Sequence, residues 1–96
     1  ILSHTVPNKK TMRAHERMPY YDYLIGEPEY ENEYFPDKII ITGHTPTGFI
    51  DPKFKGKIWR GNNHIAIDCG AVFGNPLGCI CLDTLEEFYV EEKYNE

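Results

Sequence analysis

The chain has 96 residues, enough for one small domain. Its formal net charge is −5 and its lysines and arginines are scattered, so it lacks the basic stripe that a nucleic-acid partner would require. No apolar run approaches the roughly 20 residues that span a bilayer, and no signal pattern opens the chain, so we expect a cytoplasmic protein without a membrane partner.

The first third of the chain, residues 1–36, is mostly polar. Three prolines divide it and leave only the stretch Lys9–Met18 for a short helix. From residue 37 the composition changes to short segments of residues that favour β-strands, separated by Gly, Pro and Asn. We therefore expect one domain, with a mixed leader over 1–36 and a β-rich part over 37–96.

The β-rich part contains five segments with strand character and a sixth, Thr47–Ile50, that could add a short strand. Three successive isoleucines, Ile39 to Ile41, indicate a strand covered on both faces, whereas the stretch from His64 to Cys69 alternates. We predict an α+β fold with a mostly antiparallel sheet. The five expected strands are Lys38–Thr42, Lys57–Arg60, His64–Asp68, Cys79–Leu82 and Glu87–Val90.

The three cysteines, Cys69, Cys79 and Cys81, are an odd number, and the last two fall inside an apolar run. This pattern favours reduced thiols packed as small apolar side chains. A zinc site usually offers two cysteine pairs or a cysteine pair with a histidine pair, and a disulfide framework does not suit an intracellular chain. We also expect Phe49, Trp59, Phe73 and Phe88 to fill the core or a seam between sheets.

The segment Gly43-His44-Thr45-Pro46 follows the isoleucine strand. A strand that ends at a Gly-His turn presents the imidazole at the edge of a sheet, where its neutral nitrogen can bind a metal. A histidine in a turn can equally be a hydrogen-bonded structural residue. These four residues alone leave both readings open.

A second polar cluster, Asp68-Cys69-Gly70, ends the strand that begins near His64. Asp68 can accept backbone N–H bonds and so hold the shape of a neighbouring loop, or it can act in catalysis. His64 lies on the same strand face, about 13 Å away, which is too far for both residues to bind one ion directly. We therefore predict a structural or supporting role for His64.

Together, the segments Gly43 to Thr47 and Ile65 to Gly74 resemble the C-terminal part of the calcineurin-like metallophosphoesterases. The resemblance is to the branch that holds the serine/threonine protein phosphatases and the bacterial diadenosine-tetraphosphatase-like enzymes, and it covers a little more than half of the chain. It implies that this chain is the C-terminal half of a four-layer α/β/β/α sandwich. The parent protein would hydrolyse a phosphoprotein or a small phosphoester such as a dinucleoside polyphosphate.

In that family two divalent metals, manganese, iron or zinc, activate a bridging water that attacks phosphorus. The resemblance implies that His44 is a metal ligand, and His4 is the only candidate for the histidine ligand that precedes it. No catalytic residue is assigned to this chain. Support of the site is assigned to Gly43, Thr45, Asn63, Asp68 and Gly70.

The family's upstream motifs, Asp-x-His, Gly-Asp-x-x-Asp-Arg-Gly and Gly-Asn-His-Glu, do not occur in this chain. The run Gly61 to His64 looks like the third motif but follows Gly-His, which is the wrong order. His15, in Arg13-Ala14-His15, is rejected because the Gly-His segment already fills its place. Without the carboxylate ligands we expect the chain alone to bind no dinuclear centre and to be inactive.

Two other readings stay open. The chain could be a non-catalytic β domain that binds a partner or itself, and we expect self-association because a missing half would leave apolar surface uncovered. Alternatively, His44, His64 and a carboxylate could form a self-contained mononuclear metal site.

Overall fold

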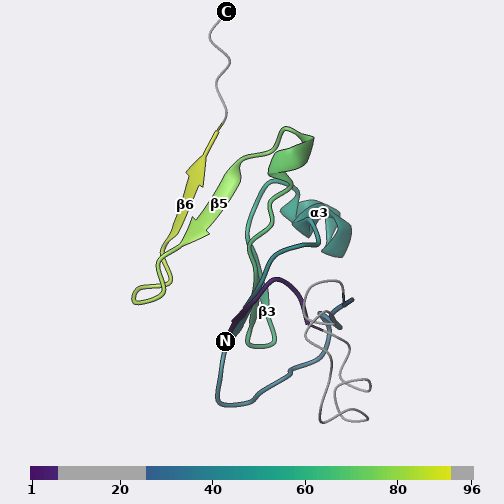
Figure 1. Cartoon of the computed structure of the whole chain (residues 1–96), viewed down its shortest axis with the longest axis vertical. Coiled ribbons are helices and arrows are strands. Elements are labelled where there is room, and N and C mark those ends of the chain that lie inside the picture. The colour runs from purple at the N-terminus through teal and green to yellow at the C-terminus, as the bar shows by residue number, and fades with distance from the viewer. Residues whose placement is uncertain (7–25, 92–96) are drawn as a thin grey trace, which may run out of the picture.

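A computed structural model describes residues 1–6 and 26–91 of the chain (Figure 1). The helix expected at Lys9–Met18 and the rejected His15 lie outside this part. The described residues form a small α+β domain with mostly strands and a few short helices. A four-stranded sheet has the order β1-β2-β4-β3, and a separate hairpin pairs β5 with β6. The strands are β1 Leu2–Ser3, β2 Ile40–Thr42, β3 Trp59–Gly61, β4 His64–Ala66, β5 Leu77–Ile80 and β6 Glu87–Val90.

The four-stranded sheet is mixed, so the prediction of a mostly antiparallel sheet is wrong for it. Strand β2 pairs in parallel with both β1 and β4, and only β3 pairs antiparallel with β4. Every residue of β2 and β4 is buried. Strands covered on both faces are typical of parallel pairing, because the connections between parallel strands pass over the faces of the sheet.

A two-residue turn at Asn62 and Asn63 joins β3 to β4. Both asparagines have positive φ angles, 52° and 56°, as a type I′ hairpin turn requires. The Asn63 amide lies within hydrogen-bonding distance of the carbonyls of Phe35 (3.2 Å) and Pro36 (3.4 Å), and its own carbonyl accepts the Ile40 N–H (2.9 Å). This turn therefore fixes the chain that enters β2.

The connection from β2 to β4 contains helix α3, Thr47–Ile50, and the 3-10 turn η1, Pro52–Phe54. The strand considered at Thr47–Ile50 is therefore wrong, because this segment forms a helical turn in which the Asp51 N–H bonds to the Thr47 carbonyl. Thr47 is fully buried, and its hydroxyl lies 2.9 Å from the Phe54 carbonyl oxygen and 2.7 Å from that of Lys57. The hydroxyl can donate its proton to either carbonyl, so Thr47 ties helix α3 to η1 and to the residues that precede β3.

Two clusters of buried side chains cover the two faces of β2. Ile41 packs with Ile58, Ile65 and Cys69 on one face, and Ile40 packs with Val6 and Tyr34 on the other. Cys69 is buried as a small apolar side chain, whereas Cys79 is exposed and Cys81 is partly exposed. The packed-thiol prediction is thus correct for Cys69 and wrong for Cys79.

The β5–β6 hairpin projects from the sheet and is attached to it by polar contacts and by Ile80 and Leu85, which pack against the core cluster around Ile41. Arg60 forms an ion pair with Glu87 (2.8 Å) and donates to the Leu85 carbonyl. The Tyr89 hydroxyl accepts the Ile58 N–H (3.0 Å) and donates to Glu87 (2.6 Å). The hairpin is therefore held mainly through its inner face and its turn.

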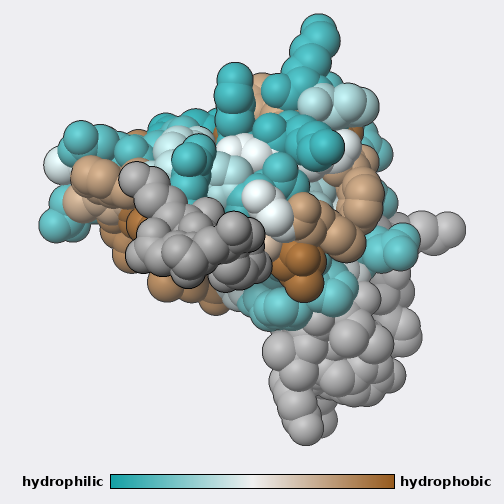
Figure 2. Space-filling view, turned by 90° about the horizontal axis from the view of Figure 1, so that it is seen from above, coloured by the Kyte–Doolittle hydropathy of each residue, from teal (hydrophilic) through white to brown (hydrophobic). Residues whose placement is uncertain are grey.

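The outer face of the hairpin is apolar and exposed. We name it the outer hairpin face and define it by the cross-strand pairs Leu77 with Val90 and Cys79 with Phe88. Figure 2 shows hydrophobic residues on the left of the molecule, the side on which Figure 1 places the hairpin. Phe88 is 50% exposed, Phe49 74% and Phe73 67%, so the prediction that these three fill the core is wrong. In the described part of the chain the one α-helix has four residues, and no helix is of membrane-crossing length and character.

Candidate functional site

The structure brings His4 and His44 together. Each follows a strand of the β1–β2 pair, and the carboxyl ends of parallel strands meet at the same edge of a sheet. The His4 carbonyl accepts the Gly43 N–H (2.9 Å) across the two strand ends. The side chains then meet, with His4 Nε2 2.8 Å from His44 Nδ1. The two histidines that the resemblance selects as metal ligands are therefore neighbours.

The backbone at His44 holds the imidazole in an unusual direction. His44 has a φ of 68°, and the Thr45 N–H bonds back to the Gly43 carbonyl (2.8 Å), which makes His44 the middle residue of a γ-type turn. Turns of this type with a positive φ are rare and strained, and such strain concentrates at functional positions. Gly43 has space for a Cβ, whose closest contact would be the His4 carbonyl at 3.9 Å, so Gly43 contributes its N–H rather than its lack of a side chain.

His4 is held from the other side. Thr5 and Val6, which follow it, are buried, and the Thr5 hydroxyl donates to the Gly26 carbonyl (2.8 Å). The chain at residues 4–6 is thus anchored beneath an exposed imidazole, and both histidines reach solvent from fixed backbone.

Asp68 and Gly70 shape the neighbouring loops. The Asp68 carbonyl accepts the Thr47 N–H (2.8 Å), and its carboxylate accepts the Gly70 N–H (2.9 Å). Gly70 has a φ of 88°, and a Cβ there would lie 2.8 Å from the Asn75 amide nitrogen. These contacts join the turn after His44 to the end of β4, which is the loop-holding role considered for Asp68.

Asn63 lies at the opposite end of the sheet from the histidine pair. It precedes β4, whereas Asp68 follows it, and its partners are at the start of β2. The structure therefore places Asn63, which was assigned to structural support of the site, in the β3–β4 turn instead. Strand register explains the difference, because residues before and after a strand point to opposite sheet edges.

His64 is buried within an aromatic cage. Its ring stacks on Tyr30 (centroids 5.1 Å apart, 25° between planes) and meets the edges of Tyr34 and Trp59. His64 Nε2 and the Thr42 hydroxyl share a hydrogen bond of 2.7 Å. Burial lowers the pKa of His64 to about 4, so the imidazole is neutral at ordinary pH. This environment suits a structural residue.

Tyr30 connects the cage to the turn after His44. Burial raises the pKa of its hydroxyl, the nearby Thr45 side chain opposes that rise, and the charge of Asp68 adds to it. From the sequence, Tyr30 is one of several tyrosines among acidic residues that could cover the lip of a site or a partner surface or simply pack, and the pattern carries no local signal that selects it. Thr45 thus joins the turn after His44 to the aromatic cage, and its support of a metal site stays a prediction.

The donor set fits part of a metal centre. His4 Nε2 and His44 Nδ1 share a hydrogen bond of 2.8 Å. Two imidazole nitrogens bound to one tetrahedral ion at about 2.1 Å would be roughly 3.4 Å apart, so metal binding would require the pair to lose the shared proton, to turn both lone pairs toward the ion and to open by about 0.6 Å. Within residues 1–6 and 26–91, no group of three His, Cys, Asp or Glu side chains could hold a metal ion. The mononuclear alternative that uses His64 is therefore not assembled in the described part of the chain.

Comparisons with protein-family models, with curated proteins and with solved structures found no match to this chain.

Proposed function

We propose that this chain is the C-terminal portion of a metal-dependent phosphoric ester hydrolase of the serine/threonine phosphatase type. The observation that carries the proposal is the 2.8 Å distance between His4 Nε2 and His44 Nδ1. The resemblance implies His44 as a metal ligand from its Gly-His segment, and His4 is the only candidate for the histidine that precedes it. Their meeting at one sheet edge is what a shared metal would require.

His4 and His44 would hold one of two divalent ions, manganese, iron or zinc, through neutral imidazole nitrogens. When bound, such a pair of ions supplies an activated water and neutralises the phosphoryl oxygens. The chain's own residues orient these ligands: the γ-type turn fixes His44, and Asp68 anchors the segment that follows it. The carboxylate ligands would come from outside residues 1–96, so the chain alone should be inactive.

The test measures hydrolysis of p-nitrophenyl phosphate with added Mn²⁺ by the whole protein that contains this chain and by residues 1–96 alone. We expect activity only in the whole protein, and a loss of roughly 100-fold or more in His4→Ala and in His44→Ala. Lys53→Ala, on the exposed turn η1, is the control and should leave the rate unchanged.

Three results would overturn the proposal: no hydrolysis by the whole protein with manganese, iron or zinc, full activity in His44→Ala, or metal-dependent hydrolysis by residues 1–96 alone, which would refute the inactivity of this chain. A phosphopeptide and a dinucleoside tetraphosphate offered to the whole protein would separate the two substrate classes.

A second candidate function, a non-catalytic β domain for self-association or partner binding, is favoured by the exposed outer hairpin face. Leu77 and Val90 on that face are 56% and 61% exposed. An inactive whole protein that associates through this face would favour the second candidate over the first.

A further inference from the structure

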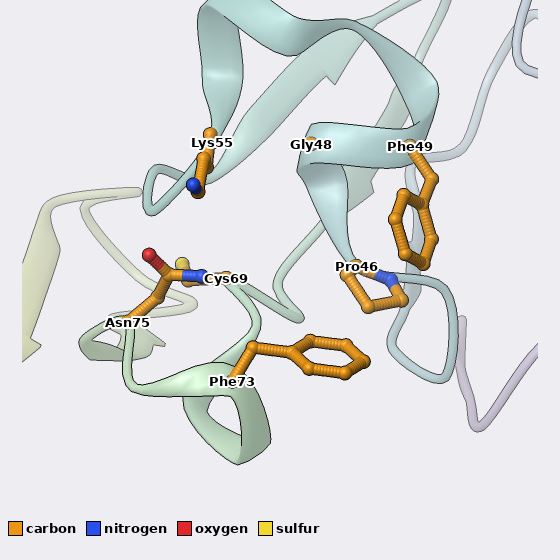
Figure 3. Close-up of a pocket in the computed structure, with 7 residues that line it drawn as sticks. All are labelled: Pro46, Gly48, Phe49, Lys55, Cys69, Phe73 and Asn75. Atoms are coloured by element: carbon orange, nitrogen blue, oxygen red, sulfur yellow. The ribbon is translucent and has the colours of Figure 1, made fainter.

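A pocket of about 310 Å³ opens beside the turn that carries His44 (Figure 3). Its volume is at the lower end of the range that small-molecule sites occupy. Pro46, two residues after His44, lines it, and the buried Cys69 lies at its base. The remaining walls come from helix α3, the turn after η1 and the 3-10 turn η2, Ala71–Phe73.

One end of the pocket is aromatic. Phe49 and Phe73 stand there with their ring centroids 6.1 Å apart and their planes at 61°. The rings are 74% and 67% exposed, although large apolar side chains are usually covered. Figure 3 shows both rings extending toward the Pro46 side of the pocket. Their positions are set by backbone hydrogen bonds from Phe49 to Pro46 (2.9 Å) and from Phe73 to Gly70 (2.9 Å).

The other end is polar. Figure 3 places the Lys55 amine and the Asn75 amide together on the side away from the rings. Within residues 1–6 and 26–91, Lys55 forms no ion pair and neither side chain has a hydrogen-bond partner. Asn75 is itself partly buried, and its backbone N–H is bonded to the Gly70 carbonyl (3.2 Å), so its position is fixed. A cation and an amide without partners form a place for an anionic group.

We propose that this pocket binds a small aromatic anion, with a planar ring against Phe49 and Phe73 and a phosphate or carboxylate group on Lys55 and Asn75. A ring gains stacking and burial at the first end, and the anion gains charge-assisted hydrogen bonds at the second. An aliphatic chain would leave the polar end unused, and an inorganic anion would leave the rings exposed. The same chemistry can come from a nucleotide or from an aryl phosphate.

This inference goes beyond the proposed hydrolase and does not depend on it, because binding can be measured without metal. If both are correct, the ligand is the organic part of the phosphoester, since Pro46 joins the pocket to the His44 turn. A failure of the hydrolase assay would leave the binding result standing, and the reverse also holds.

The test is an NMR titration of ¹⁵N-labelled residues 1–96 in a chelator, with phenyl phosphate and AMP as probes. Inorganic phosphate and benzyl alcohol serve as the ringless and the uncharged control. We expect saturable shifts of Gly48, Phe49 and Phe73 with at least one probe, at a Kd about tenfold or more below that of either control. Binding of AMP alone identifies a nucleotide site, phenyl phosphate alone an aryl phosphate site, and both the shared chemistry.

Variants locate the site. Phe49→Ala and Lys55→Met should each raise the Kd about tenfold, because each removes one end of the pocket while altering an exposed side chain. Phe73→Ala removes the second ring of the aromatic end and should also raise the Kd. Val72 is 84% exposed and does not line the pocket, so Val72→Ala should leave the Kd unchanged. The proposal is overturned if neither probe binds, if a control binds as tightly, or if the Phe49 and Phe73 variants retain full affinity.

Discussion

The Nε2 atom of His4 lies 2.8 Å from the Nδ1 atom of His44, across a sequence separation of 40 residues. Both rings are exposed, so together they offer two imidazole nitrogens to one ion. We expect residues 1–96 to bind Ni²⁺ weakly at a ratio of one per chain, since imidazole suits this ion and two ligands leave most positions to water. Isothermal titration calorimetry should show that His4→Ala and His44→Ala each abolish this binding.

Cys79→Ser is the matched control for metal binding, because Cys79 is an exposed thiol that could bind Ni²⁺ on its own. If Cys79→Ser lost its affinity for Ni²⁺ and His44→Ala kept it, the ion would bind at Cys79 and not at the histidine pair.

His64 should make stability depend on pH. Burial lowers its pKa to about 4, below the 6.5 of an unfolded histidine. The unfolded chain therefore binds more protons between these values, so the free energy of unfolding is highest above pH 6.5 and falls as the pH drops toward 4. We expect a loss on the order of 2 kcal/mol between pH 7 and pH 5, measured by urea denaturation.

The histidine titration can be followed directly in the folded protein. The His64 imidazole signal in an NMR pH series should stay that of the neutral ring down to about pH 5. His64→Gln, which keeps a hydrogen-bonding group near Thr42, should flatten the pH dependence of stability. A His64 midpoint near 6.5 in the folded protein would refute the assignment.

Gly78 is required by packing. A Cβ there would lie 2.6 Å from Cys69 Sγ and 3.2 Å from both Ile58 Cγ1 and the Ile67 carbonyl oxygen. Gly78→Ala should therefore destabilise the fold by about 1–3 kcal/mol, through separation of the hairpin from the core. The comparison is Gly43→Ala, whose Cβ would have only ordinary contacts. Thermal unfolding of both variants checks this, and equal melting temperatures would contradict it.

The outer hairpin face should drive self-association. Its side chains form a contiguous apolar patch on a two-stranded element, and soluble monomers rarely leave such patches uncovered. Phe88→Lys should shift the mass in light scattering toward that of the 11.2 kDa monomer. Leu82 is 56% exposed, close to the 50% of Phe88, but lies in the turn, so Leu82→Lys should leave the measured mass unchanged. A monomeric wild type at high concentration would count against this expectation.

The positions of strands β2 to β6 were predicted from local patterns, but β1 was not, and neither were the strand partners. Glu87–Val90 is confirmed at both ends, and the other expected strands are present with shifted bounds. The isoleucine run was correctly interpreted as a covered strand. Its parallel pairing depends on which distant segments reach it, and alternation within a segment carries no information about that choice.

In the candidate site, too, local sequence patterns pointed to individual residues but not to the contacts between them. The resemblance suggested His44 from its Gly-His segment and left His4 as the only candidate before it, but neither predicted that the rings would touch. The cage around His64 combines residues from β3, β4 and the segment before β2, so no single segment carries its signal. The exposed Phe49 and Phe73 were misplaced because hydrophobicity predicts burial only on average.

Strand β1 has two residues and pairs only with β2 in the described part of the chain. We therefore expect β1 to open at a lower free energy than the other strands of the sheet, although Thr5 and Val6 beyond it are buried, and its release would separate His4 from His44 while β2, β3 and β4 remain paired. Amide hydrogen exchange would show this as faster exchange at Ile41, whose N–H bonds to the Ile1 carbonyl, than at Ile67, bonded to Thr42. Binding of a metal ion by His4 and His44 would then depend on local opening of β1 and not on global unfolding.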